Sequence, residues 1–394
     1  MTPSAVVSRR GAERLQTGHP WIYRSDIIDA AAERGDIVRV VTERGRPLGW
    51  AYWSSESQIA VRMVSMATGA TPPDERQLIE TRVRAAAAYR ASLGIDDTAW
   101  RLVHAESDGL PATIVDRYGD EHGTWFVVQT LSQAADRRLA LLVDILVELF
   151  QPTGVLARND PRVRTLEGLD TSVTEMYGDV PQRVHVREGG VLYAADLRAG
   201  QKTGLFLDQR ENHAAAARYA HGEVLDAFTY NGGFALQMAA RAVSVLALDS
   251  SAAAVAVTEA NAELNGLANV EVREANVFDE LRELEVSGRK FDTISLDPPA
   301  FAKTKASVER ALGGYKEINL RALRLLRPGG HLITCSCSYN VDDALFLDVI
   351  KSAAADSHAG LWLVERRTQS LDHPTLVTVP ETSYLKCLIL RRTS

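Results

Sequence analysis

The residues best suited to chemistry follow short apolar runs in the second half of the chain. Asp226, Asp249 and Asp297 each stand at the end of such a run, and Cys337 ends another. In sheets of parallel strands, ligands bind beyond the carboxyl ends of the strands. The spacing therefore predicts that acids and a thiol from separate strands meet at one edge of a sheet.

Residues 226–234, DAFTYNGGF, read as a strand that runs into a glycine pair opening a helix. Gly232 and Gly233 let the backbone approach a ligand, because no Cβ stands in the way. The segment lacks the spacing of a dinucleotide fingerprint and the lysine of a phosphate-binding loop. It therefore suits a ligand without a pyrophosphate, although a tight connection with no ligand explains this segment alone equally well.

Two further strands end in polar residues. Asp249 closes VSVLALD, where an acid can accept both hydroxyls of a ribose. The alternative is a helix cap, for which Asp249, Ser250 or Ser251 would serve. Asn276 follows the third strand and can meet an adenine edge or simply form a turn.

The fourth and fifth strands end in DPPAF, residues 297–301, and TCSCS, residues 334–338. Two prolines stiffen the backbone and remove two donors, which predicts a rigid shelf beside Asp297. Asp297 can then accept from, or protonate, the edge of a base; a merely stiffened loop is the alternative. Most free cysteines are small buried apolar side chains, and we expect this of Cys335. Cys337 falls where a side chain would face the site.

The elements that must position these residues predict a multidomain α/β protein. Residues 1–72 are short β-rich runs, and ATGATPPD marks a boundary after them. Residues 73–183 are a middle α+β domain, with helices expected over 75–93 and 134–150. Residues 184–394 alternate strand and helix, which indicates a parallel sheet covered on both faces. A last strand, YLKCLILRR, is expected to be antiparallel.

Composition restricts the class of protein. The net charge of -7 argues against a protein that coats nucleic acid indiscriminately, but phosphate contacts depend on local patches. Three arginine clusters could form such patches or simply be solvated: Arg9, Arg10 and Arg14; Arg82, Arg84 and Arg90; Arg158, Arg162 and Arg164. We expect a cytoplasmic protein with no membrane association and no metal site, because no span, signal peptide, disulfide framework or zinc spacing is found.

Taken in order, these motifs resemble the PUA-containing, RlmI-like family of class I methyltransferases that form 5-methylcytosine in large-subunit ribosomal RNA. RGAERLQTGHPWIYRSDI resembles the opening of the family's PUA domain, and TGLFLDQREN resembles the segment before its glycine turn. FTYNGGFAL, LALD, DPPAFAK, GYKEIN and SCS follow in the family's order, and DHP and YLK stand near the end. The resemblance covers essentially the whole chain.

The resemblance implies an N-terminal PUA domain that binds RNA, a middle α+β domain and a C-terminal Rossmann-like catalytic domain. It implies S-adenosylmethionine as cofactor and a cytosine of ribosomal RNA as substrate. Cys337 would add to carbon 6 as a thiolate, and Asp297 would bind N3 and the exocyclic amine. The residues expected to bind the cofactor are Asp208, Arg210, Asp226, Phe228, Tyr230, Asn231, Gly232, Gly233, Asp249, Ser250, Asn276 and Asp297.

The chain departs from the wider RNA 5-methylcytosine enzymes at Ala300, where many carry a second cysteine that helps release the product. Release of the methylated product would use water or another group of the protein. Lys303, Lys305 and Tyr315 are candidates, although we favour the alternative that they are solvated or contact phosphate.

Two other functions stay open. A methyltransferase acting on guanine N7 or an exocyclic amine would need no nucleophilic cysteine. A non-catalytic RNA-binding protein would need neither the acids nor the glycines. The oligomeric state is also open, and a homodimer is compatible with the sequence.

Overall fold

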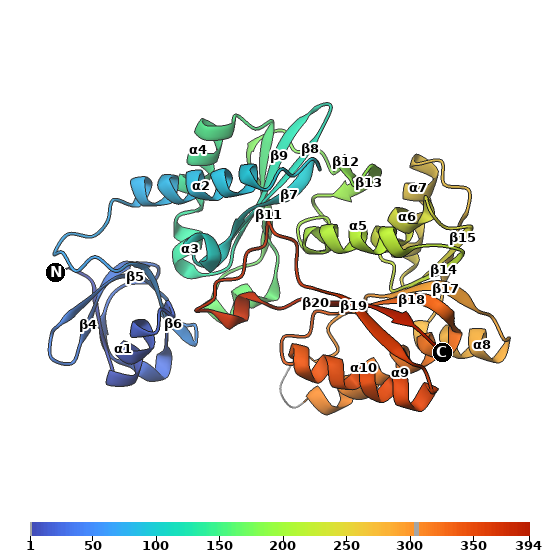
Figure 1. Cartoon of the computed structure of the whole chain (residues 1–394). Helices are drawn as coiled ribbons and strands as arrows, with labels where there is room; N and C mark the ends of the chain where they lie inside the picture. The colour runs from blue at the N-terminus through green and yellow to red at the C-terminus, as the bar shows by residue number, and fades with distance from the viewer. Residues whose placement is uncertain (1, 303–306) are drawn as a thin grey trace. The chain divides into compact units, whose positions relative to one another are not determined.

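The computed structural model describes residues 2–302 and 307–394 (Figure 1). The chain forms two compact units, each built from several segments. The first contains Met1–Val186, Ala195–Leu205 and Asp372–Thr382; the second contains Arg187–Ala194, Phe206–Leu371 and Ser383–Ser394. The boundaries at 72 and 183 stay predictions.

The first unit begins with a six-stranded sheet in the order β2-β6-β5-β4-β1-β3. The sequence did not reveal the first strand or the helix α1 (Arg9–Gln16), whose N-terminus is capped by the Ser8 side chain. Alternating apolar residues fill the interior, among them Val38, Val40 and Val61. The strands are β1 (Ser4–Val7), β2 (Trp21–Tyr23), β3 (Ile27–Ala31), β4 (Ile37–Thr42), β5 (Pro47–Trp53) and β6 (Ile59–Ser65).

A five-stranded sheet in the order β11-β10-β9-β8-β7 follows in the same unit. The predicted helix over 134–150 is wrong in one respect, because it is interrupted at Arg138. The Arg138 guanidinium donates to the carbonyls of Gly35 and Ala134 at 2.7 and 2.9 Å and so binds the break in place. The elements are α2 (Glu75–Ser92), β7 (Ala99–His104), β8 (Thr113–Asp120), β9 (Gly123–Thr130), α3 (Gln133–Arg137), α4 (Leu139–Phe150), β10 (Gly154–Asn159) and β11 (Ser172–Gly178).

Two of the three arginine clusters are largely structural. Arg90, Arg158 and Arg164 are buried, and each donates to backbone carbonyls within the unit. Arg82 donates to the carbonyls of Val64 and Gly109. These guanidiniums stabilise loops and are not available as a solvated basic patch. The cluster on α1 is different, since Arg9 is exposed.

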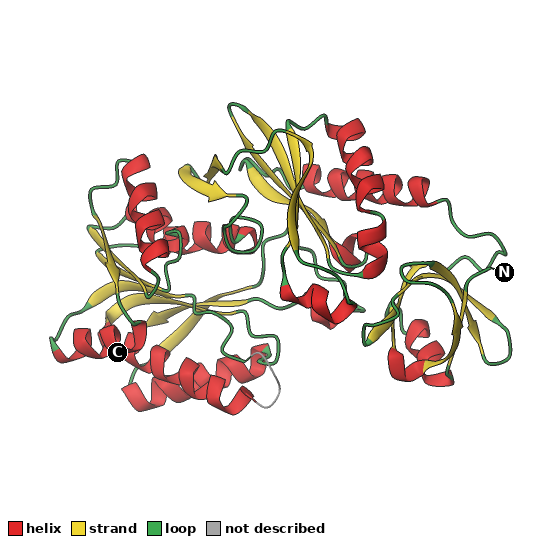
Figure 2. Ribbon diagram, turned by 180° about the vertical axis from the view of Figure 1, so that it is seen from behind, coloured by secondary structure: helices red, strands yellow, loops and turns green. Residues whose placement is uncertain are grey.

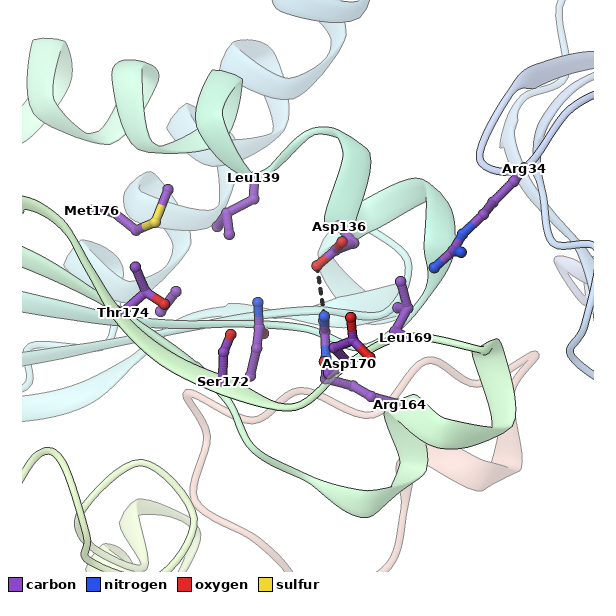
Figure 3. Close-up of a pocket in the computed structure, with 11 residues that line it drawn as sticks. Arg34, Asp136, Leu139, Arg164, Leu169, Asp170, Ser172, Thr174 and Met176 are labelled. Carbon is purple, nitrogen blue, oxygen red and sulfur yellow. Dashed lines mark hydrogen bonds and ion pairs between the residues drawn. The ribbon is translucent and has the colours of Figure 1, made fainter.

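A cavity of about 290 Å³ opens beside the edge strand β11 in the first unit (Figure 3). Three of its charged side chains have protein partners: Arg164 pairs with Asp136 at 2.9 Å, and Arg34 donates to the carbonyl of Gly168 at 2.8 Å. None of the residues expected to do chemistry lines this cavity; these residues belong to the second unit.

The second unit contains a seven-stranded sheet in the order β16-β15-β14-β17-β18-β20-β19. The first five strands in this order are parallel, and the predicted antiparallel pairing of the last strand is confirmed. The chain reverses its direction of travel across the sheet between β14 and β17, the position where such folds bind ligands. The strands are β14 (Glu223–Ala227), β15 (Ser244–Asp249), β16 (Val270–Glu274), β17 (Phe291–Leu296), β18 (Leu326–Ser336), β19 (Leu361–Arg367) and β20 (Lys386–Arg392).

Helices cover both faces of this sheet (Figure 2). One face packs against α8, α9 and α10, and the other against α5 and α6. Burial on both faces explains the continuous apolar runs of the central strands. The helices are α5 (Arg210–Tyr219), α6 (Gly233–Ala239), α7 (Ala252–Leu264), α8 (Val277–Val286), α9 (Val308–Leu325) and α10 (Asp343–Ser357); β12 (Arg183–Glu188) and β13 (Val191–Asp196) pair separately. No helix among the described residues is long and apolar enough to cross a membrane.

Candidate active site at the switch point of the second unit

The glycine turn follows β14 and is held from below by Asp226. The Asp226 carboxylate accepts from the hydroxyls of Thr229 and Ser295 at 2.6 and 2.5 Å and from the backbone N–H of Ala235 at 3.1 Å. The side chain is buried, so its contacts are with the turn and the adjacent strand. Asp226, expected among the cofactor-binding residues, therefore acts in this structure by fixing the shape of the turn.

Two residues of the turn that are not glycine have left-handed backbones, with φ of 68° at Phe228 and 50° at Tyr230. Such conformations cost about 1 kcal/mol or more and persist only where neighbours enforce them. Here the N–H of Tyr230 donates to Asp249 at 3.0 Å, and its carbonyl accepts from Thr258 at 2.7 Å. The turn is thus tied to the neighbouring strand and helix.

The two glycines serve different purposes. Gly232 has φ of 87°, which L side chains rarely adopt. At Gly233, a Cβ would lie 2.5 Å from Cε1 of His213, so this glycine is required by packing inside the protein. His213 is bonded to Glu188 at 2.7 Å. Burial disfavours the imidazolium, but the Glu188, Asp297 and Asp226 carboxylates together outweigh burial and raise the pKa of His213.

We expect Gly233→Ala to destabilise the protein by about 1 to 3 kcal/mol, because the added methyl group overlaps the buried His213 ring. Gly313→Ala in α9 is the matched control: nothing lies within 4 Å of its Cβ position, so we expect a small gain in stability. Denaturant unfolding measures both. Equal stability of the two variants would contradict the packing argument.

The ends of β15 and β16 place Asp249 and Asn276 near the turn. Asp249 accepts from the N–H groups of Tyr230 and Ser251 at 3.0 Å each, which leaves further lone pairs on both oxygens. Ser251 caps α7, and Ser250 is exposed beside it. The Asn276 oxygen caps α8 by accepting from the N–H of Phe278 at 3.0 Å. Asn276 is exposed, and its amide NH₂ forms no hydrogen bond to any residue that the structure describes, so it can donate to a ligand.

An aromatic wall stands beside these polar groups. The Phe228 ring lies 6.5 Å from that of Phe278 and 6.4 Å from that of Phe301. A second aromatic contact, 5.0 Å between Phe206 and Tyr230, flanks the turn. Apolar walls with a few placed polar groups are typical of small-molecule sites.

β17 and β18 are adjacent parallel strands that end at the same edge, so the segments that follow them, with Asp297 on one and Cys337 on the other, are neighbours. The Cys337 sulfur lies 3.9 Å from the carbonyl oxygen of Pro298. Cys337 is half-buried, whereas Cys335 is fully buried opposite Cys387 on β20. The expectation that Cys335 is a core residue is confirmed.

The Asp297 carboxyl lies in an acidic, poorly solvated environment. Desolvation raises its pKa to about 7, the Asp208 and Asp226 carboxylates add to the rise, and His213 and a hydrogen bond from Gln209 oppose it. Asp208 is buried and accepts from the Tyr384 hydroxyl at 2.7 Å. A carboxyl with a pKa near 7 can both give and take a proton at neutral pH.

The raised pKa implies a stability cost. Between its ordinary pKa near 4 and its folded pKa of about 7, Asp297 holds its proton more tightly when folded, so stability falls as pH rises through this window. We expect Asp297→Asn to be more stable than the wild type at pH 8 by roughly 1 to 3 kcal/mol, and little different at pH 4. Denaturant unfolding at both pH values measures this; an advantage independent of pH would contradict it.

Most of the predicted site residues lie in one region, but some are buried, such as Asp208 and Asp226, and others are exposed, such as Ser250. Asn231 contributes its carbonyl, which accepts from Asn261 at 3.0 Å, and Arg210 is buried at the start of α5. The sequence analysis gave no role to Gln209 or His213, and it included Tyr384 only as part of the YLK segment of the resemblance; Gln209 lies in the segment TGLFLDQREN, which His213 follows closely.

The three candidates for product release have different outcomes. Lys303 and Lys305 lie outside the described residues. Tyr315 is fully buried, with its hydroxyl bonded to the hydroxyls of Ser336 and Ser338 at 3.0 and 2.9 Å. The interpretation of Tyr315 as a solvated or phosphate-contacting residue is therefore wrong. Burial raises the pKa of Tyr315, so it stays a neutral phenol.

A sheet of this order, with a glycine turn after β14 and an acid ending β15, defines the class I methyltransferases. Residues 163–391 match the model of the S-adenosylmethionine-dependent methyltransferase family, and residues 6–66 match a PUA-like domain. The chain belongs to the S-adenosylmethionine-dependent methyltransferase family.

Curated relatives match the chain over nearly its whole length and theirs. A protein of Shewanella denitrificans named "Ribosomal RNA large subunit methyltransferase I" is 39% identical, over 97% of both chains. Proteins of the same name from Aliivibrio fischeri and Vibrio cholerae are each 37% identical, over 98% of both chains.

Solved structures support the fold. SMU.776, determined in complex with SAH, has a TM-score of 0.84 at 20% identity and covers 100% of both chains. A SAM-dependent methyltransferase from Streptococcus mutans has a TM-score of 0.83 at 19% identity, again over 100% of both chains.

The residues present fit S-adenosylmethionine. The free lone pairs of Asp249 suit two ribose hydroxyls, the Asn276 amide and the wall containing Phe228 suit adenine, and the turn at Gly232 gives close access to the backbone. The cofactor of this family is S-adenosylmethionine.

Proposed function

We propose that this protein methylates carbon 5 of a cytosine in large-subunit ribosomal RNA through a transient covalent bond to Cys337. The contact between the Cys337 sulfur and the Pro298 carbonyl, at 3.9 Å, carries the proposal, because it brings a thiol next to the residue that follows Asp297. The names of the curated relatives and the PUA-like match support ribosomal RNA as the substrate.

The chemistry requires a nucleophile because carbon 5 of cytosine is a poor one itself. The Cys337 thiolate forms a bond to carbon 6, and the Asp297 carboxyl gives its proton to N3, which takes up the displaced electron pair. Carbon 5 becomes the nucleophilic end of an enamine. S-adenosylmethionine, when bound, supplies an electrophilic methyl group.

Release reverses the addition. A base removes the proton from carbon 5, the electron pair re-forms the double bond to carbon 6, and the carbon–sulfur bond breaks. The thiolate returns to Cys337, and Asp297 recovers its proton from N3. Ala300 has no basic side chain, and the hydroxyl of buried Tyr315 is hydrogen-bonded to Ser336 and Ser338. These two facts favour water as the acceptor of the carbon 5 proton.

Asp297 is suited to its part because its pKa is about 7, close to the working pH. The target cytosine has to leave its base stack to reach carbon 6, so the RNA is expected to present it unpaired or flipped. The cofactor residues are proposed to be those that the sequence indicated, with Asp226 acting through the turn it holds.

The experiment is to incubate the purified full chain with deproteinised ribosomal RNA and isotopically labelled S-adenosylmethionine, then digest the RNA to nucleosides for mass spectrometry. Labelled 5-methylcytidine is the expected product. Labelled 7-methylguanosine or an N-methylated base would overturn the cytosine assignment. The same assay is run on intact ribosomal particles, and absence of label from both deproteinised and particle RNA would overturn the assignment of ribosomal RNA as the substrate.

A further inference from the structure

The lysine that opens β20 stands next to the proposed nucleophile. Lys386 is the register partner of Ser336, the last residue of β18, and Cys337 follows directly. Its ammonium donates to the carbonyl of Ser338 at 2.8 Å and to that of Tyr384 at 2.9 Å. The ammonium of Lys386 therefore lies at the carbonyl of Ser338, the residue that follows Cys337.

This charge is buried, since only 6% of Lys386 is exposed. Within the described part of the chain, its two hydrogen-bond partners are neutral carbonyls, so no bonded carboxylate neutralises it. An ammonium in this position is expensive unless an anion lies nearby. Desolvation lowers the pKa of Lys386, and the charge of Cys337 is the largest influence that raises it again.

The other titratable groups near Cys337 contribute no comparable positive charge. Tyr315 of α9 is a neutral phenol whose pKa the Cys337 charge also raises. Asp342 and Asp343, at the start of α10, act on Lys386 but are exposed and therefore screened by solvent. On β17's side, Asp297 is protonated for part of the time near neutral pH.

We propose that Lys386 is a positioning residue that keeps Cys337 in its thiolate form near neutral pH and makes it the reactive thiol of this chain. The electrostatic influence is reciprocal: an ammonium that a thiolate stabilises must stabilise that thiolate equally. The inference deepens the proposed function, because a nucleophile at carbon 6 has to be ionised before it attacks.

The test is the pH dependence of alkylation of Cys337 by iodoacetamide in the full chain, followed by mass spectrometry of the Cys337 peptide. Cys335 and Cys387 are fully buried and serve as internal references. We expect a wild-type midpoint below the value of about 8.5 for free cysteine. Lys386→Met should move the midpoint upward by about one pH unit or more, roughly a tenfold slower reaction at pH 7.

Lys386→Arg keeps the charge and should keep a low midpoint, which separates charge from packing. Lys386→Gln can still donate to the carbonyls of Ser338 and Tyr384 without a charge, and it replaces Met if that variant does not fold. An unchanged midpoint in the neutral variants, or equal shifts in Arg and Met, would overturn the proposal. Neither outcome depends on RNA, so failure here and failure to form 5-methylcytidine are distinguishable.

Discussion

Replacing Cys337 by serine is expected to lower the rate of methyl transfer to RNA by at least about a thousandfold, because a hydroxyl near neutral pH does not add to carbon 6. S-adenosylmethionine binding should be unchanged, since none of the residues proposed to bind the cofactor lies on β18 or is Cys337 itself. Single-turnover transfer of labelled methyl groups measures the rate, and calorimetric titration measures binding.

Cys335→Ala is the matched control for this prediction. Cys335 lies two residues earlier on β18 and is fully buried opposite Cys387, although it interacts with Asp297 and Gln209; the variant should lose some stability and keep far more of the rate than Cys337→Ser below its unfolding temperature. RNA containing 5-fluorocytidine adds a direct test: carbon 5 then has no proton to lose, and the Cys337 adduct should accumulate. A serine variant that retains its rate would show that the methyl acceptor is a nitrogen atom.

Replacing Asp297 by asparagine is expected to lower kcat by about 10² to 10⁴, because an amide can donate to N3 but cannot transfer a proton to it. The wild-type enzyme needs a protonated Asp297 and an ionised Cys337. Its rate should therefore rise with the ionisation of the thiol and fall as pH passes about 7, where Asp297 loses its proton. The falling limb should be absent from the variant.

The control for Asp297 is the same change at Asp292, at the opposite end of β17. Asp292 accepts from Arg327 and from the N–H of Glu223 at 2.7 and 2.8 Å, far from the carboxyl ends of the strands. Asp292→Asn should affect stability and leave the shape of the pH profile unchanged. A profile measured as kcat against pH decides the matter: a falling limb that persists in Asp297→Asn would assign it to another group.

The amino-acid sequence predicts the alternation of strands and helices after residue 184. It also predicts the acids and the thiol at the ends of those strands. The reason is local: apolar runs of strand length, glycine pairs and Asp-Pro-Pro report on the backbone within a few residues. Asp297 could be nominated this way, because parallel strands must end at a common edge, whereas the choice of Cys337 rested partly on the family resemblance. The interruption of the helix at Arg138 was not predicted; the Arg138 side chain there donates to the carbonyl of Gly35, about a hundred residues away, a contact that no local pattern reports.

What required the tertiary structure was the environment of each side chain. Nothing near Asp226 in the sequence shows that Thr229, Ser295 and Ala235 occupy its oxygens. In the sequence, Arg90, Arg158 and Arg164 read as surface charges. In the structure their guanidiniums donate to backbone carbonyls. The pKa of Asp297 and the position of Lys386 beside Cys337 likewise depend on desolvation and on strands about fifty or more residues apart, since electrostatic energies follow distance in space and not along the chain.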